Sequence, residues 1–441
     1  MKKGIFWVAF VIVLGVIGMP VLNGMILEKR VRQSFEDMNP GTGTSGSGTR
    51  FEILSYDRRF FSSEIQWRIV SQALENSWGI HEILFLDRVR HGFTGASTTT
   101  SLEKNPWILD MVNKKLNGKN PLTLETEIRF WGRMESRLAL EAFSYRDTEG
   151  VVEVRPGRAG LSMDRGKDRV VLKMDFEGLD LAGKIRLDGF SWQSDLERVS
   201  GNIRAGKASF FLKKFQSSDP EKTTTLSNAA FDYELVYHPE EVSVSISTQG
   251  RLDAFQSGGE EIKNAAAGFH IRHMDAGGYE DLLAFFREGA AEIMNSGPSN
   301  RQDMDAVRRA MEKQAADKGF EWVGICEKLL KKGLEIEISG LKAQVPEGKI
   351  EADARIGLEN DLPLSGVLSF LMDPSTLLAY LSLESRIILP KGLYPTGRML
   401  LSPMFSGMPT GLFVMEKDHL LHRAETREGK LFLNSKEVIF N

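Results

Sequence analysis

Four histidines are the residues whose spacing could hold a metal ion. They form two His-x-x-His pairs, His270 with His273 and His419 with His422. Imidazole nitrogen is a common zinc ligand, but a protein zinc site needs three or four ligands. Both pairs fall in segments that read as strands, where a spacing of three places two side chains on opposite faces. Neither pair has a nearby cysteine or a convincing set of carboxylates, so we expect surface or satisfied core histidines and no metal site.

The sequence also lacks the short motifs that would identify a nucleophile or a phosphate site. It contains no Gly-x-Ser-x-Gly elbow and no His-Glu-x-x-His pair. The glycine-rich stretch Gly41 to Gly46 lacks the lysine and the preceding strand of a phosphate-binding loop. Cys326, the single cysteine, lies on the apolar side of a predicted helix and is expected to be a packing residue. We therefore predict no catalytic residue, no cofactor and no metal.

The composition is that of a water-soluble body. Of the 441 residues, 41% are hydrophobic and 26% are charged, and 60 acidic residues nearly balance 56 basic ones. This balance gives no indication of a nucleic-acid partner. The length is sufficient for a large core, in two or three units by the usual domain size.

One segment at the start of the chain has a different character. The 19 residues from Gly4 to Leu22 are uncharged and follow Lys2 and Lys3. As a helix they would be about 28 Å long, close to the thickness of the hydrocarbon core of a bilayer. We expect residues 1–27 to form a single-pass anchor in a bacterial inner membrane, crossing the lipid bilayer with residues 4–22, with most of the chain in the periplasm. The alternative is a cleaved signal peptide, although no Ala-x-Ala-like site follows the run.

The remaining segments predict a fold that is α+β and mainly β. Residues 28–49 are expected to be a juxtamembrane segment and a Gly/Ser/Thr tether. Residues 50–276 alternate apolar and polar positions, as at Leu122 to Phe130 and at Val242 to Ile246, which is typical of half-buried strands in an antiparallel sheet. Residues 277–333 have apolar steps of three and four and predict a central amphipathic helical segment. Residues 334–441 return to strands, with a short helix at Asp373-Pro374. The large antiparallel sheet can be curved and elongated.

Three short motifs resemble the YdgA-like family of bacterial proteins. The segment from Tyr56 through Arg58 and Phe61 to Ser63 is similar to that family's Tyr-x-Arg-Gly-x-Phe-x-Ser signature, with Arg59 in the glycine position. His91-Gly92 resembles its His-Gly-Pro, and Gly429 to Ser435, which includes Asn434, resembles its closing Gly-x-Leu-Thr-Leu-Asn-Gly. The resemblance implies an inner-membrane-anchored periplasmic protein of uncharacterised function, and it brings no catalytic residues.

The same motifs also have a structural interpretation. We expect Tyr56, Phe60 and Phe61 to seat the first hairpin on the core, and His91-Gly92 to form a turn at the end of a strand.

Two classes of function follow from the sequence. The first is a non-enzymatic envelope protein that binds a lipid, a lipoprotein or another protein on an apolar sheet surface, with Val244 and Ala354 on the binding face. The second is a periplasmic hydrolase whose residues come from distant parts of the chain. A continuous apolar groove would favour the first class, and a polar pocket with converging ionisable groups would favour the second.

Overall fold

The computed structural model describes most of the chain. The described residues are 23–29, 31–33, 35, 36, 39, 49–71, 75, 81–103, 113, 116, 118, 120–129, 132–147, 150–164, 166, 168–218, 222–295, 319–363, 366, 376, 378, 380–393 and 412–438. The expected membrane segment 4–22 and the expected helix start at Asp373-Pro374 lie outside them. None of the helices in the described ranges is long and apolar enough to span a membrane.

The described residues are mainly β, as the alternating pattern predicts. They contain 22 strands in an antiparallel sheet, two α-helices with described bounds and one short 3-10 helix. The chain divides into two compact units. Unit 1 contains residues 1–148, 153–174 and 285–317, and unit 2 contains residues 149–152, 175–284 and 318–441.

Unit 1 is built from short antiparallel strands. Neighbours pair in the order β1, β2, β3, β4, β5, β6, β9. Along Leu122–Arg129 half-buried and exposed positions alternate strictly, so this predicted strand has one wet face. The bounds are β1 (Thr49–Arg58), β2 (Ser62–Ser71), β3 (Glu82–His91), β4 (Gly95–Leu102), β5 (Leu122–Arg129), β6 (Met134–Leu140), β7 (Phe143–Asp147) and β9 (Gly157–Met163). β8 (Gly150–Val154) and β10 (Arg169–Leu181) cross the division between the units.

A helical stretch, residues 23–29, 31–33, 35 and 36, packs on the sheet of unit 1. Leu27 is buried against Ile65 and Val89. Just beyond the stretch, the Asn39 side chain donates to the Phe51 carbonyl at 2.6 Å and accepts from the Phe51 amide at 2.9 Å. These two bonds join Asn39, after the helical stretch, to β1. Residues 40–48, which make up most of the expected Gly/Ser/Thr tether, lie outside the described residues.

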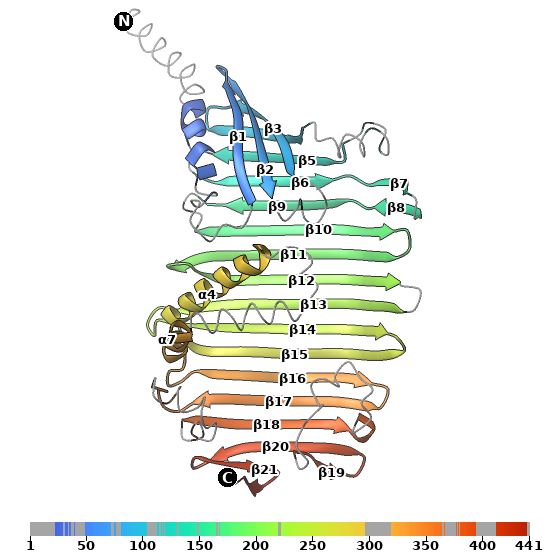
Figure 1. Cartoon of the computed structure of the whole chain (residues 1–441), viewed down its shortest axis with the longest axis vertical. Coiled ribbons are helices and arrows are strands. Elements are labelled where there is room, and N and C mark those ends of the chain that lie inside the picture. Colours follow the sequence, from blue (N-terminus) through green and yellow to red (C-terminus); the bar gives the residue numbers. More distant parts are fainter. Residues whose placement is uncertain are drawn as a thin grey trace, which may run out of the picture. The chain divides into compact units, whose positions relative to one another are not determined.

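Unit 2 contains the long strands. β11 to β15 follow one another as antiparallel hairpins, and β16, β17, β18 and β20 continue the ladder (Figure 1). The bounds are β11 (Ile185–Ser200), β12 (Ile203–Ser218), β13 (Thr223–His238), β14 (Ser243–Ser257), β15 (Glu260–Asp275), β16 (Glu335–Val345), β17 (Gly348–Leu358), β18 (Leu381–Pro390), β19 (Val414–Glu416), β20 (His419–Arg427), β21 (Lys430–Leu433) and β22 (Lys436–Glu437). The helices of unit 2 are α7 (Gly319–Leu329) and η3 (Lys391–Leu393), and α4 (Ala276–Asn295) crosses the division between the units after Ala284.

One local expectation needs correction. Val242 has a left-handed backbone (φ 50°) and precedes β14, because it belongs to the hairpin turn and not to the strand. A similar left-handed residue, Lys417 (φ 55°), turns the chain between β19 and β20.

One face of the unit 2 sheet carries its core, and we call it the apolar face. Val244, Leu235 and Met274 are buried there together with Leu334 and Leu358. Residues of the helical segment pack on this cluster, among them Ala276, Tyr279, Leu329 and Leu330. A second cluster on the same face contains Val345, Ile350, Leu389 and Leu420. The helical residues thus cover part of the apolar face.

Six consecutive strands of unit 2 each carry one extra residue, and we call these residues the seam. They are the positions that the ladder pairing skips, namely Gly189, Lys213, Asn228, Asp253, Asn264 and Gly340, from β11 to β16 in order. On one side of the seam a cross-strand row joins Leu187, Phe215, Leu226, Phe255 and Ile262, and on the other side a row joins Trp192, Phe210, Phe231, Gly250 and Ala267. In every strand the apolar positions change between odd and even numbers across the seam. The extra residues therefore keep both rows on the apolar face.

Backbone conformation explains how the chain accommodates the seam. Gly189, Asn228, Asn264 and Gly340 have φ values between 49° and 62°. Glycine and asparagine adopt this left-handed region more readily than other residues. The side-chain amide of Asn228 donates to an Asp253 carboxylate oxygen at 2.8 Å. The backbone amide of Gly340 donates to an Asp353 carboxylate oxygen at 2.7 Å. These bonds satisfy polar groups at positions that the regular ladder skips.

Candidate functional site

Three residues of the family-like motifs meet beneath the helical stretch of unit 1. Tyr56, Ser63 and His91 come from β1, β2 and β3, and ladder pairs place them on one face. The Ser63 hydroxyl and the His91 Nε2 lie 3.0 Å apart in a hydrogen bond. Ser63 is 1% exposed and His91 is 6% exposed. This group is therefore sealed from solvent.

A serine bonded to a histidine invites comparison with a nucleophile and its base. In the described part of the chain, however, no partner reaches the buried His91 Nδ1, so no carboxylate orients the ring. Burial, with the charge of Arg58 nearby, lowers the pKa of His91 and favours the neutral ring. Because both side chains are buried, the Ser63–His91 pair is a packing contact between β2 and β3.

The other motif residues of unit 1 connect hairpin tips to the helical stretch. Arg58 pairs with Glu28 at 3.2 Å. The Asn23 amide donates to the Gly92 carbonyl at 2.6 Å, and the Gly92 amide donates to the Gly95 carbonyl at 2.7 Å. The expected turn at His91-Gly92 is therefore present, because β3 ends at His91 and this bond closes the turn to β4.

The expectation that Phe60 and Phe61 seat the hairpin on the core is wrong. They are 52% and 55% exposed, and their rings pack edge to face with centroids 4.7 Å apart. Both residues lie in the turn between β1 and β2, beyond the reach of the sheet face. Tyr56 does belong to the core side, where it packs beside Ile65 and Val89.

Asn434, the motif residue near the C-terminus, also has a structural role. It has a left-handed backbone (φ 49°) just after β21. Its side chain accepts from the Arg423 amide at 2.9 Å and donates to the Leu412 carbonyl at 3.1 Å. These bonds hold the last turn against β20.

The four histidines bind different partners. His270 bonds to the hydroxyls of Ser247 (2.9 Å) and Ser339 (3.1 Å), while His273 bonds to Glu241 (2.8 Å). The prediction that His270 and His273 face opposite sides is wrong. His273 is a bulge residue (φ 56°), so Ile271 and Met274 share the core side and both histidines occupy the other one.

In the second pair the ladder keeps its regular alternation, which places His419 and His422 on opposite faces. His422 bonds to Ser385 at 3.1 Å and to the Leu412 carbonyl at 2.9 Å. Among the described residues no group of three potential metal ligands occurs.

The two residues proposed for binding, Val244 and Ala354, both lie on the apolar face but in different surroundings. Val244 is completely buried, so a ligand has no access to it. Ala354 is half-buried and pairs with Ile338 on one side and Ser385 on the other. The accessible part of the face is therefore around Ala354.

Large apolar side chains remain exposed on this face. Trp192, Phe231, Phe269, Ile338 and Ile356 are each between 38% and 45% exposed. They come from five strands, and Phe269 lies directly opposite Ile338 in the ladder. A concentration of exposed apolar area on one side of a sheet normally marks a binding surface.

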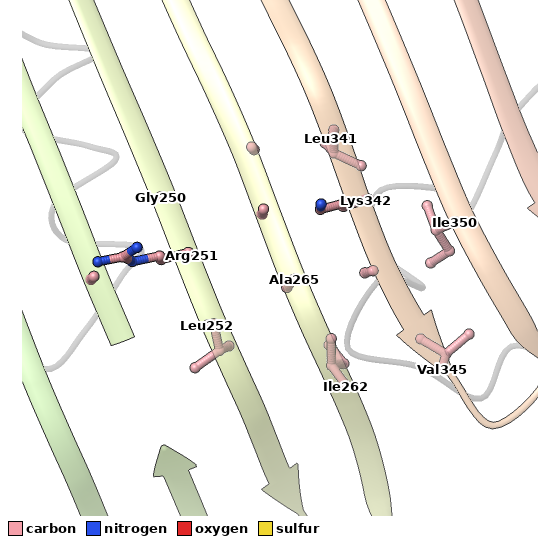
Figure 2. A pocket seen from close by; sticks show the side chains of 13 residues that line it. Gly250, Arg251, Leu252, Ile262, Ala265, Leu341, Lys342, Val345 and Ile350 are labelled. Atoms are coloured by element: carbon pink, nitrogen blue, oxygen red, sulfur yellow. The ribbon is translucent and has the colours of Figure 1, made fainter. Parts of the chain in front are cut away.

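A hollow of about 440 Å³ lies beside these residues, where β13 to β17 meet the seam (Figure 2). Eleven of its thirteen lining residues are glycine, alanine or aliphatic, including Gly250, Leu252, Ile262, Ala265, Ala266, Ala267, Leu341, Val345 and Ile350. The two charged lining residues, Arg251 and Lys342, flank Ala266 in the ladder and alternate with apolar neighbours. Their side chains thus belong to the opposite face of the sheet. The volume is within the range of small-molecule sites, roughly 300–1,000 Å³.

Small side chains create this hollow. Ala265, Ala266 and Ala267 are consecutive in the middle of β15, where β-branched and aromatic residues are usual. This run of three alanines in a strand is the sequence signal for the hollow. Ala265 and Ala267 share the apolar face with Leu252 and Leu341, whereas Ala266 faces the other side with Arg251 and Lys342. Because Ala265 and Ala267 contribute little side-chain volume, Leu252 and Leu341 line the two sides of an open space.

Comparison with known proteins finds one matching family. A family model described as a bacterial protein of unknown function matches residues 1–396. The chain belongs to the DUF945 family. The match includes the seam and the hollow of this DUF945 protein, and it ends before the motif that contains Asn434. Searches of curated proteins and of solved structures gave no match.

Proposed function

We propose that this DUF945 protein is a non-enzymatic, membrane-anchored protein of the bacterial periplasm that binds an acyl chain in the hollow of unit 2. The acyl chain would belong to a lipid or to a lipid-modified protein. The observation that carries the proposal is the apolar lining between Leu252 and Leu341, next to exposed Phe269 and Ile338.

The chemistry of the lining favours an acyl chain over a peptide. A peptide brings amide and carbonyl groups that need hydrogen-bond partners when they leave water. The strands around the hollow are paired on both sides, so their backbone groups are already used in the ladder. An acyl chain brings no polar groups to the hollow, and each buried methylene contributes about 0.8 kcal/mol.

The uncharged run from Gly4 to Leu22 indicates that the acyl chain can come from a bilayer. If it anchors the chain as the sequence predicts, the protein remains close to a bilayer. The hydrolase class has weaker support, since the Ser63–His91 pair is buried.

Crosslinking from one strand tests the proposal. A photoreactive residue is placed at Ala354, on the apolar face, and in a matched control at Glu351, on the opposite face of β17. We expect lipid adducts from position 354 in cells and none from position 351, together with fatty-acyl species in the extract of the purified protein. Equal labelling at both positions, or no lipid adduct in a folded protein, would overturn the proposal. A protein adduct without an acyl group would favour a protein partner.

A further inference from the structure

The hairpin tips of unit 1 present a separate apolar surface. Phe60 and Phe61 in the turn between β1 and β2, and Phe93 in the turn between β3 and β4, are between 52% and 55% exposed. The His91 amide donates to the Phe61 carbonyl at 2.8 Å, which brings the two turns together. Three phenylalanines that are more than half exposed in joined turns form a patch that water solvates poorly.

The helical stretch begins at the same place. The Asn23 amide bonds to the carbonyls of Gly92 at 2.6 Å and Phe93 at 3.5 Å. Met25 and Ile26, in the first turns of the described stretch, are 50% and 44% exposed. Five exposed apolar side chains therefore surround the point where residue 22, the last of the uncharged run, joins the described chain.

We propose that this tip, formed by Met25, Ile26, Phe60, Phe61 and Phe93, docks on the surface of the lipid bilayer. Aromatic and aliphatic side chains lower their free energy by entering the boundary between headgroups and acyl chains. The chain itself indicates the occupant, because the uncharged run from Gly4 to Leu22 ends one residue before Asn23. Arg90, the residue before His91 on β3, is exposed, which suits contact with lipid phosphates.

Two buried contacts beneath the tip join it to the rest of unit 1. The Ser63–His91 bond joins β2 to β3 just below the turns. The Asn23–Gly92 bond fixes the start of the helical stretch to the turn that carries Phe93. These contacts would hold unit 1 at a fixed orientation to the membrane surface. The tip is independent of the acyl-chain site, which lies in unit 2.

Site-directed labelling of the full chain in lipid nanodiscs of phosphatidylethanolamine and phosphatidylglycerol tests this proposal. Cys326 is replaced by alanine, and a nitroxide is attached to Phe61→Cys, Phe93→Cys or Leu54→Cys. Leu54 is the matched control, because it is 47% exposed on β1 and lies six residues from Phe60. Labels at 61 and 93 should be more accessible to oxygen, which concentrates in lipid, than to a water-soluble nickel chelate, and the label at 54 should show the reverse.

Equal behaviour of the three labels would overturn the proposal, as would failure of the full chain to enter nanodiscs. Labels at 61 and 93 that are shielded from both reagents without dependence on lipid would assign the tip to a protein contact. Far-ultraviolet circular dichroism of each labelled protein shows that the strands are intact. A tip-specific oxygen preference is the one result that supports docking on the bilayer.

Discussion

Gly24 lies directly against the imidazole of His91, and a Cβ at position 24 would stand 2.5 Å from the His91 Cε1 atom. The helical stretch can approach β3 this closely only because residue 24 has no side chain. The contact also covers the Ser63–His91 hydrogen bond. A glycine in a helix normally lowers stability, so close packing is the physical reason for it here.

Replacement of Gly24 by alanine should therefore destabilise unit 1. The new methyl group must displace the imidazole or the helical stretch, at a cost of about 1–3 kcal/mol. Gly324→Ala in α7 is the matched control, because its Cβ would meet nothing within 4 Å and should stabilise by about 0.4–1 kcal/mol. Urea unfolding of both variants checks the two signs. A stabilising effect at position 24 would contradict the contact.

His91 should make stability depend on pH. Burial lowers its pKa in the folded chain, so on acidification the unfolded chain binds the proton first. The contribution of His91 to the free energy of unfolding is therefore complete above about pH 6.5, the ordinary histidine pKa. It decreases as the pH falls below this value. His91→Gln should flatten this dependence. Unfolding midpoints between neutral and mildly acidic pH measure the slope.

The control for this prediction is His81→Gln, at a histidine whose side chain is 66% exposed. Burial raises the pKa of the Asp87 carboxyl nearby, and this effect is shared by all three proteins. Identical slopes for wild type and His91→Gln would show that the imidazole does not control the pH response.

The left-handed backbone of the seam gives a second stability test. Asn264→Ala should destabilise by about 1 kcal/mol, because alanine pays more than asparagine to hold φ at 49°. Asn264→Gly should be close to neutral, since glycine adopts this region freely. Thermal unfolding compares the two variants. If alanine is tolerated as well as glycine, strain at this position is not significant.

The two residues first proposed for binding should now respond differently. Ala354→Ile adds volume to the accessible part of the apolar face and should reduce acyl-chain binding with little change in melting temperature. Val244→Asp should instead destabilise strongly, because it places a charge in a site that is 0% exposed. Lipid retention and melting curves of both variants separate the effects. A large loss of stability in Ala354→Ile would mean that this part of the face is a closed core.

The alternation of apolar and polar residues was sufficient to predict the strands and hairpins. It was not sufficient to predict the features that depend on a local backbone conformation or on contacts between elements. Alternation identified Leu122–Arg129 and the antiparallel hairpins because each strand has one wet face. The bulge at His273 was missed because a single left-handed residue leaves no trace in a three-residue spacing. Phe60 and Phe61 read as core residues because hydrophobicity alone does not distinguish a buried ring from one at a tip.

The hollow could not be predicted from the sequence, because it is formed by residues of several strands. Leu252 and Leu341 are far apart in the sequence, and only the pairing of β14, β15 and β16 places Ala266 between their strands. The packing of Leu27 on Ile65 was hidden because the segment after it resembles a free tether. For the hollow the missing fact was the registration of three strands, and for Leu27 it was the packing of a helical stretch on the sheet.

The seam restricts how the sheet of unit 2 can change in evolution. If one strand alone lost its seam residue, every side chain beyond that point would move to the opposite face of the sheet. Single-residue deletions at Asn228 or Asn264 should therefore be strongly selected against. Two adjacent strands with matched seam residues can leave or enter together, because the rows on either side then remain aligned. Members of the family should therefore differ in length here by whole hairpins, with one seam residue at the same level in each added strand.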